Sequence, residues 1–223
     1  MTRLSVLIPI YNEERELAAC LRQVLASSVA YEFIAIDDCS TDGTPKILEQ
    51  FSDPRLHVIR HEKNRGKGGA IQTALKHATG DYVIIQDADT EYNPNDYARL
   101  LEPIENRIAK VVYGSRDADL RRQPFVGYLG NRFLTVVTNM LVGTGLQDME
   151  TCYKLVPADV MRALNIESRG FELEPEITVK IARRHIPIYE VPISYNPRHD
   201  KKLHRVRDGL RSLAAIIRYR FSN

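Results

Sequence analysis

The stretch VIIQDADTE, residues 83–91, changes from apolar to acidic within a few positions. Its apolar start is typical of a buried strand, and Asp87, Asp89 and Glu91 follow at alternate positions. On a continuing strand, alternate side chains face the same way, so three carboxyl groups are predicted to crowd one strand end. Such oxygen ligands suit Mg²⁺ or Mn²⁺, which usually keep several waters and bridge to substrate phosphates. A solvated loop after a strand would show the same pattern, so both readings are open at this point.

Similar apolar runs alternate with helical patterns through the first half of the chain. The predicted strands are Leu4–Ile10, Phe33–Ile36, Leu56–Ile59, Tyr82–Ile85 and Val111–Tyr113, and the predicted helices are Glu13–Ala26, Thr44–Phe51, Gly69–Ala78 and Asn95–Ile104. This alternation predicts an α/β fold with a largely parallel sheet and helices on both faces. The second half is less regular, with helices expected at Arg132–Leu141, Glu176–Arg184 and Arg205–Tyr219 and strands near Cys152–Val156 and Ile186–Ile193. Ligands of such sheets bind beyond the carboxyl ends of the strands.

The overall charge excludes a protein that coats nucleic acid. The 223 residues include 31 Lys and Arg against 29 Asp and Glu, a formal net charge of +2. Eight cations and two acids fall within residues 196–223, so this tail is strongly basic. The three cysteines lie far apart and match no metal-ligand spacing, which favours a reducing, cytosolic setting. The apolar runs are too short for a signal peptide or a spanning helix, so we expect any membrane contact to be peripheral.

Two further motifs follow predicted strands. In IAIDDCSTDGT, Asp37 and Asp38 could accept hydrogen bonds from a base or a ribose, or they could favour the start of the next helix. In NRGKGGAI, residues 64–71, a glycine-rich turn opens a helix, whose amides could bind an anion. No Ser or Thr follows Lys67, so this turn is not a Walker A loop, and a simple helix start explains it equally well.

Taken in order, these motifs resemble the family 2 inverting glycosyltransferases with a GT-A fold, and especially the dolichyl-phosphate mannosyltransferase-like branch. The resemblance covers about residues 4–198 and rests on VLIPIYNEE, IAIDDCSTDGT, NRGKGGAI, DYVIIQDADTEYNP, VVYGSR, LQDMETCYKLVPADV, GFELEPEI and YEVPISYNPR. It implies a single domain, with residues 1–116 binding the nucleotide sugar, residues 117–198 binding the acceptor, and residues 199–223 forming a basic amphipathic segment.

The resemblance also implies roles for individual residues. The nucleotide-sugar site would comprise Pro9, Tyr11, Glu13, Asp37, Asp38, Lys67, Asp87, Ala88, Asp89 and Glu174. The metal, Mg²⁺ or Mn²⁺, would be bound by Asp87, Asp89 and Glu91, with Glu91 standing where many relatives have Gln. The acceptor phosphate would be held by Arg116, Arg132, Arg198 and Lys201. Asp89, Asp148, Arg116 and Arg132 would be the catalytic residues; Asp148 could orient the acceptor, act as a base for a hydroxyl acceptor, or serve only as a capping or salt-bridge residue.

Two segments bear on the acceptor. Residues 125–143, FVGYLGNRFLTVVTNMLVG, are apolar but broken by polar residues, as in an interfacial helix, an acceptor groove or a buried core helix. Residues 203–221, LHRVRDGLRSLAAIIRYRF, place Val206, Leu210, Leu213 and Ile217 on one face among arginines. This helix could bind an anionic membrane surface or pack against the domain.

We therefore expect a metal-dependent hexosyltransferase, peripheral on the cytosolic face of a membrane. It would use a GDP-mannose- or UDP-glucose-type donor and a dolichyl- or undecaprenyl-type polyprenyl phosphate. Two alternatives are the same fold acting on a soluble or polymeric glycan hydroxyl, and a catalytically silent nucleotide-sugar binding module. Donor base, sugar, metal and oligomeric state do not follow from the sequence.

Overall fold

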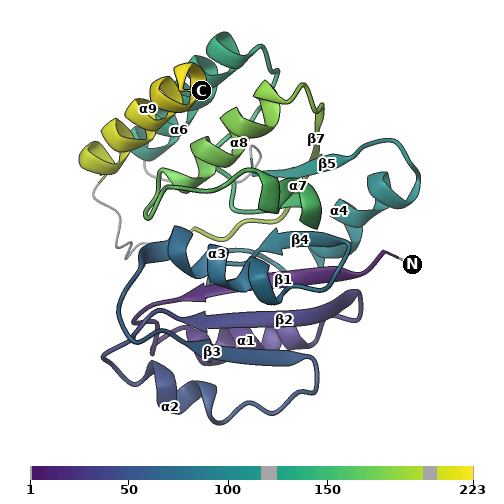
Figure 1. The fold of residues 1–223 in the computed structure, drawn as a ribbon, viewed down its shortest axis with the longest axis vertical. Coiled ribbons are helices and arrows are strands. Elements are labelled where there is room, and N and C mark those ends of the chain that lie inside the picture. The colour runs from purple at the N-terminus through teal and green to yellow at the C-terminus, as the bar shows by residue number, and fades with distance from the viewer. Residues whose placement is uncertain (1, 117–124, 198–204, 223) are drawn as a thin grey trace.

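The computed structural model of the protein describes residues 2–116, 125–197 and 205–222. The strands of this part form one sheet in the order β3-β2-β1-β4-β6-β5-β7 (Figure 1). They are β1 (Leu4–Ile10), β2 (Ala30–Asp37), β3 (Leu56–Arg60), β4 (Tyr82–Ile85), β5 (Val111–Ser115), β6 (Lys154–Pro157) and β7 (Ile188–Pro192). Neighbours run parallel except at β6, which is antiparallel to β4 and to β5. This mostly parallel sheet confirms the predicted α/β class.

Helices connect the strands and cover the sheet. They are α1 (Leu17–Leu25), α2 (Thr44–Leu48), α3 (Gly66–His77), α4 (Asp96–Glu105), α6 (Phe125–Val142), α7 (Ala158–Ala163), α8 (Leu173–Arg183) and α9 (Arg205–Phe221). In Figure 1, α3 lies on the near face of the sheet and α1 on the far face. Helix α9 packs against α6 and α8, so the C-terminal segment is part of the folded domain.

Burial on both faces of the sheet explains why β1 is apolar at every position except Ser5. Leu4, Val6, Leu7 and Ile8 have no solvent exposure, because a parallel strand with helices on both faces buries both sets of side chains. One polar contact is also buried at this level: Glu32 accepts hydrogen bonds from Ser5 Oγ at 2.5 Å and from the Thr79 amide at 2.6 Å. The core thus contains a hydrogen-bonded carboxylate remote from the strand carboxyl ends.

Most predicted elements are present, with shifted boundaries. The first helix begins at Leu17 and not at Glu13, because residues before it form a turn in which the Leu17 amide bonds to Glu13 O at 2.9 Å. Helix α6 begins at Phe125, seven residues before the predicted start at Arg132. The short helix α7 was not predicted. The sequence therefore predicted the presence of most helices and strands more accurately than their first and last residues.

The C-terminal helix differs from the prediction in which face it buries. Its buried positions include Asp208, Ser212, Ile216 and Tyr219, whereas Leu210 is 62% exposed. Ile217, at 48%, is also exposed. Two members of the predicted apolar stripe therefore face solvent, and the polar Asp208 and Ser212 face the domain.

Candidate active site

The carboxyl ends of β1, β2 and β4 meet at one edge of the sheet, because these strands are parallel neighbours. The loops that follow β1 and β2 are bonded to each other. The Asn12 amide donates to Ser40 Oγ at 3.0 Å, and Asn12 Oδ1 accepts from the Thr41 amide at 2.8 Å. Asn12 and Cys39 both have positive φ, at 53° and 64°, a conformation that clusters at ligand sites. The loops after β1 and β2 are therefore joined at the carboxyl edge of the sheet, where the sequence predicts that ligands bind.

The two aspartates after β2 have different surroundings. Asp38 holds the glycine-rich turn: its carboxylate accepts from the Arg65 and Gly66 amides at 2.8 and 2.7 Å and contacts His61 Nδ1 at 2.7 Å. Asp37 Oδ1 accepts from the Ser40 amide at 2.9 Å. Its buried Oδ2 faces Arg60 Nε at 3.3 Å without a hydrogen bond among the described residues. Asp38 is therefore bonded to the glycine-rich turn, whereas Asp37 is paired with Arg60.

The glycine-rich turn needs glycine for packing against another part of the chain. A Cβ at Gly66 would lie 2.3 Å from Arg169 O, and one at Gly68 would lie 1.7 Å from Ser168 O. Gly66 also has φ of 77°, which glycine adopts without strain. The turn therefore fixes α3 against the segment before α8, and this accounts for its glycines without a bound phosphate.

Lys67 joins the carboxyl end of β4, here called the strand mouth, to α8. Its Nζ lies 2.8 Å from Asp87 Oδ1 and 2.7 Å from Glu174 Oε1. Burial opposes the charge, but the carboxylates of Asp87 and Glu174 together raise the pKa of Lys67 well above its ordinary value. Burial likewise opposes ionisation of Asp87, yet Lys67 lowers the pKa of that carboxyl. One ammonium group thus bridges two carboxylates from distant parts of the sequence.

The three acidic side chains after β4 point to different partners. Asp87 binds Lys67, whereas Asp89 Oδ1 accepts from the Glu91 amide at 3.1 Å. Glu91 Oε2 accepts from Tyr195 Oη at 3.0 Å. Among residues 2–116, 125–197 and 205–222 there is no group of three or more His, Cys, Asp or Glu arranged to hold a metal ion. The predicted three-carboxylate site is therefore not assembled in this structure.

These residues nevertheless fit the usual way in which proteins hold Mg²⁺ and Mn²⁺. Such ions are commonly bound by one or two carboxylates together with substrate phosphates and waters. Asp89 is 8% exposed at the strand mouth, and Asp87 lies two positions before it. The donor set suits a hard cation completed by a diphosphate better than a cage made only of protein.

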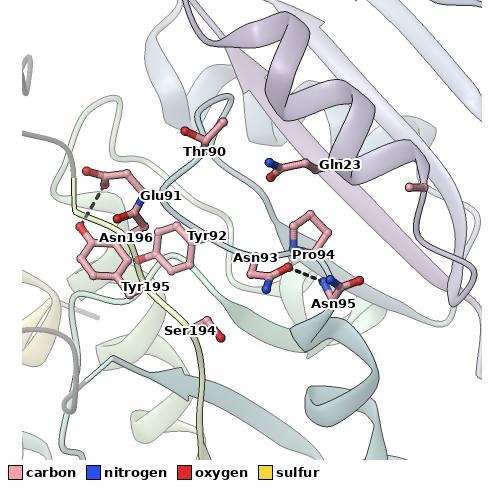
Figure 2. Close-up of a pocket in the computed structure, with 11 residues that line it drawn as sticks. Gln23, Thr90, Glu91, Tyr92, Asn93, Pro94, Asn95, Ser194, Tyr195 and Asn196 are labelled. Atoms are coloured by element: carbon pink, nitrogen blue, oxygen red, sulfur yellow. Dashed lines mark hydrogen bonds between the residues drawn. The ribbon is translucent and has the colours of Figure 1, made fainter.

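A polar groove of about 760 Å³ adjoins this loop (Figure 2). Its walls come from α1, the loop after β4 and the segment after β7, and its lining residues are Gln23, Ala26, Thr90, Glu91, Tyr92, Asn93, Pro94, Asn95, Ser194, Tyr195 and Asn196. Figure 2 shows the Glu91 and Tyr195 side chains meeting at one end of it. Glu91 therefore lies between this groove and the strand mouth.

Arg116 and Asp148 form a buried, two-pronged ion pair. Arg116 Nε and Nη2 donate to Asp148 at 2.6 and 2.8 Å, and the side chains are 8% and 0% exposed. Burial opposes both charges, but each partner stabilises the other: the pKa of Arg116 is raised well above its ordinary value and that of Asp148 is lowered. The Arg116 amide and Asn131 Nδ2 also donate to Asp148, each at 3.1 Å. Asp148 therefore orients Arg116, and a role as general base would require breaking this pair.

The remaining predicted residues are spread around this centre. Arg132 is exposed on α6 and donates to Gln147 O at 3.3 Å. Tyr11, which follows β1, is 44% exposed, and Ala88 is buried at 5%. Pro9 and Glu13 are partly buried on either side of the β1 end, and Arg198 and Lys201 lie outside the described residues.

Several residues around Arg116 were not predicted as site residues. The Arg116 guanidinium lies over the ring of Tyr195, 4.9 Å from its centroid, and 5.8 Å from that of Tyr92. Asn131 had only one signal, a polar side chain within an apolar run. Glu150 had no such signal in the sequence. In the structure, burial and, to a smaller extent, the charge of Glu174 raise the pKa of its carboxyl to about 7.

Comparison with known proteins adds a family match and a fold match. Residues 5–161 match the model of glycosyl transferase family 2. The chain is 28% identical over 222 residues to the low-salt glycan biosynthesis hexosyltransferase Agl6 of Haloferax volcanii, covering 96% of this chain but about half, 53%, of that relative. It is 27% identical over 243 residues to the dolichyl-phosphate beta-glucosyltransferase of Dictyostelium discoideum, covering 98% and 74% of the two chains.

Solved structures of glucosyl-3-phosphoglycerate synthase from Mycobacterium tuberculosis share the fold. The complex with Mn²⁺, UDP-glucose and phosphoglyceric acid has a TM-score of 0.79 at 19% identity, over 98% of this chain and 80% of that one. The same protein has also been solved with Mg²⁺ and UDP. This likeness confirms the GT-A fold that the motifs predicted.

Proposed function

This chain belongs to glycosyl transferase family 2, and we propose that it transfers a hexose, with inversion, from a nucleoside diphosphate sugar to a polyprenyl phosphate. The relatives named above include a dolichyl-phosphate glucosyltransferase. We place the reaction at the cytosolic face of a membrane. Cys20, Cys39 and Cys152 are all free thiols, in keeping with a reducing compartment.

The observation that carries the acceptor proposal is an exposed apolar surface on two adjacent helices, here called the α6–α9 face. Its side chains are 45–80% exposed and comprise Leu129, Phe133, Val136 and Met140 on α6 and Leu210, Ile217 and Phe221 on α9. The α6 members recur every three or four residues, so they form one stripe. Figure 1 shows α6 and α9 side by side at one end of the molecule.

The same helix α6 also reaches the buried ion pair. Asn131 contacts Asp148, and Arg132 lies next to it among the exposed apolar residues. A polyprenyl phosphate combines an anionic head with a long hydrocarbon tail, so it matches a helix that carries both features. Exposed arginines on α9, such as Arg211 and Arg218, would attract an anionic lipid surface. In the part of the chain that the structure covers, no helix has the length and apolarity to cross a bilayer.

The donor would occupy the strand mouth. The nucleoside would lie against Tyr11 and Asp37, and the diphosphate would lie beyond β4 near Asp89. Mg²⁺ or Mn²⁺ held by Asp89, with Asp87 beside it, would supply Lewis-acid stabilisation of the departing diphosphate. Glu174, bridged to Asp87 by Lys67, would face the hexose.

In the proposed reaction, an oxygen of the acceptor phosphate attacks the anomeric carbon while the bond from that carbon to the diphosphate oxygen breaks. A phosphate monoester has a second pKa of about 6, so the nucleophile is largely ionised at neutral pH and needs no strong base. Asp148 then acts through Arg116, which it holds by two hydrogen bonds. Arg132, exposed on α6, would orient the phosphate.

The test is transfer from a panel of GDP- and UDP-sugars to a polyprenyl phosphate, with Mg²⁺ or Mn²⁺. Formation of the glycosyl lipid supports the proposal, and a folded protein that neither transfers nor hydrolyses any donor contradicts it. Vesicle flotation checks the lipid surface: Phe133→Asp with Met140→Asp should lose binding to anionic vesicles, while Ile108→Asp, which changes an exposed residue outside that face, should keep it.

The polar groove of Figure 2 favours one second candidate, transfer to a glycan hydroxyl. Its amide and hydroxyl side chains could hold a polyhydroxylated acceptor. Transfer to oligosaccharides but not to polyprenyl phosphate, together with no vesicle binding, would select this alternative.

A further inference from the structure

Three side-chain oxygens near the strand mouth are buried and without a hydrogen-bond partner among the described residues. They are Glu150 Oε1, Thr151 Oγ1 and Glu174 Oε2. Thr151 is fully buried and Glu174 is 6% exposed. Most buried polar atoms in folded proteins have a partner, and each exception requires an explanation. We call these three residues the acidic subsite.

The acidic subsite lies on the β6 side of the strand mouth, away from the loop that follows β2. Lys67 bonds both to Glu174 Oε1 and to Asp87 at the end of β4, at 2.7 and 2.8 Å. Glu150 and Thr151 precede β6, which pairs with β4, and Glu150 is near enough to Glu174 for the two charges to repel. A group attached to a diphosphate at Asp87 would therefore extend toward these three oxygens.

The chemistry of the subsite suits neutral hydroxyl groups. Burial, followed by the charge of Glu174, raises the pKa of Glu150 to about 7, so near neutrality its carboxyl can donate as well as accept. The other charged groups around it are Lys154, Arg116 and Asp148. Glu174 accepts, and the Thr151 hydroxyl can do either.

We propose that Glu150, Thr151 and Glu174 bind the hydroxyl groups of the donor's hexose, and that Glu150 and Thr151 select among hexoses. This inference rests on the proposed function, because it requires a nucleoside diphosphate sugar at the strand mouth. A hexose presents several hydroxyls that each donate and accept, which would satisfy all three buried oxygens at once.

The test compares the affinity of each variant for a nucleoside diphosphate and for the corresponding sugar nucleotide, by calorimetry with Mn²⁺ present and without any acceptor. The probes are UDP, GDP, UDP-glucose, UDP-N-acetylglucosamine and GDP-mannose. Glu150→Met and Thr151→Val each remove a polar group while keeping volume, and each should weaken binding of the preferred sugar nucleotide by roughly tenfold with the diphosphate unchanged. Glu150→Gln, which can still donate and accept, should retain most of the sugar's contribution. Glu105→Met, at an exposed position on α4, is the control.

The outcomes separate the two proposals. If the native protein binds a sugar nucleotide more tightly than its diphosphate and both volume-keeping variants retain that difference, the subsite is wrong while the donor site stands. If the native protein binds none of the five probes, the proposed function itself fails. Thr151→Val also reports on folding: its hydroxyl has no partner to lose, so thermal stability should not fall.

Discussion

Replacing Lys67 by methionine should destabilise the fold through the charges that it leaves behind. The ammonium group contacts Asp87 at 2.8 Å and Glu174 at 2.7 Å and is mostly buried. Removing one partner of a buried ion pair typically costs about 3–5 kcal/mol. For a chain of this length 1 kcal/mol corresponds to about 2–4 °C, so Lys67→Met should lower the melting temperature by roughly 6–20 °C in a calorimetric scan at pH 8.

Two further results should accompany the lower melting temperature of Lys67→Met. Without the cation, the pKa of Asp87 in the folded state must rise, so the stability gap to the native protein should narrow as pH falls and this carboxyl takes up a proton. Adding Glu174→Gln to Lys67→Met should recover part of the loss, because one of the two stranded charges is gone. Lys76→Met, at an exposed position on the same helix, should change stability by less than about 0.5 kcal/mol. A Lys67→Met protein as stable as the native one would refute the argument.

Three other substitutions test other buried charged groups, those of Arg116, Glu150 and Glu32. Arg116→Lys should reduce the urea unfolding free energy by about 2–4 kcal/mol, because lysine cannot make both bonds to Asp148; no change would contradict the pair's importance. Between pH 4.5 and 7 the folded Glu150 holds a proton that the unfolded chain releases, so the contribution of Glu150 to the free energy of unfolding falls as pH rises. Glu150→Gln should therefore remove a decline of roughly 3 kcal/mol in the free energy of unfolding measured across that range. The pKa of Glu32 is lowered: burial opposes ionisation, but hydrogen bonds from Ser5 and Thr79 outweigh it. Glu32→Gln should therefore cost about 1.5–3 kcal/mol at pH 7 and less at pH 3, where an equal cost would refute the assignment.

The fold was predictable because its signals are local. An apolar run such as Leu4–Ile10 must lie in a sheet covered on both faces, and β1 does. The polar residues after the parallel strands β1, β2 and β4 then had to share one edge of the sheet. By contrast, the periodicity of apolar residues did not predict which side of α9 packs against the domain, since the helix buries Asp208 and exposes Leu210. Apolar residues lie on more than one side of this helix, so their spacing alone does not show which side packs against the domain.

The site was predictable in its residue types but not in its pairings. Sequence motifs singled out Lys67, Asp87 and Glu174 separately, yet their bridge joins positions up to 107 residues apart. Asp38 has the same residue type as Asp37 but is committed to the glycine-rich turn. Such assignments depend on which loops cross above the sheet, and no spacing within one motif contains that information.

The charge balance at the strand mouth argues for the proposed divalent cation. The buried cations Lys67 and Arg116 are already paired with carboxylates, the Lys154 ammonium group donates to the Met149 and Thr151 carbonyl oxygens, and Asp89 adds a further acidic group. A diphosphate entering this poorly hydrated site would meet like charges, whose repulsion grows as the local dielectric falls. Binding therefore needs positive charge brought from outside, so chelation should weaken nucleoside diphosphate affinity by at least about tenfold. Equal affinity with and without chelator would mean instead that the ion pairs rearrange and that Lys67 or Arg116 releases its carboxylate to receive the phosphate.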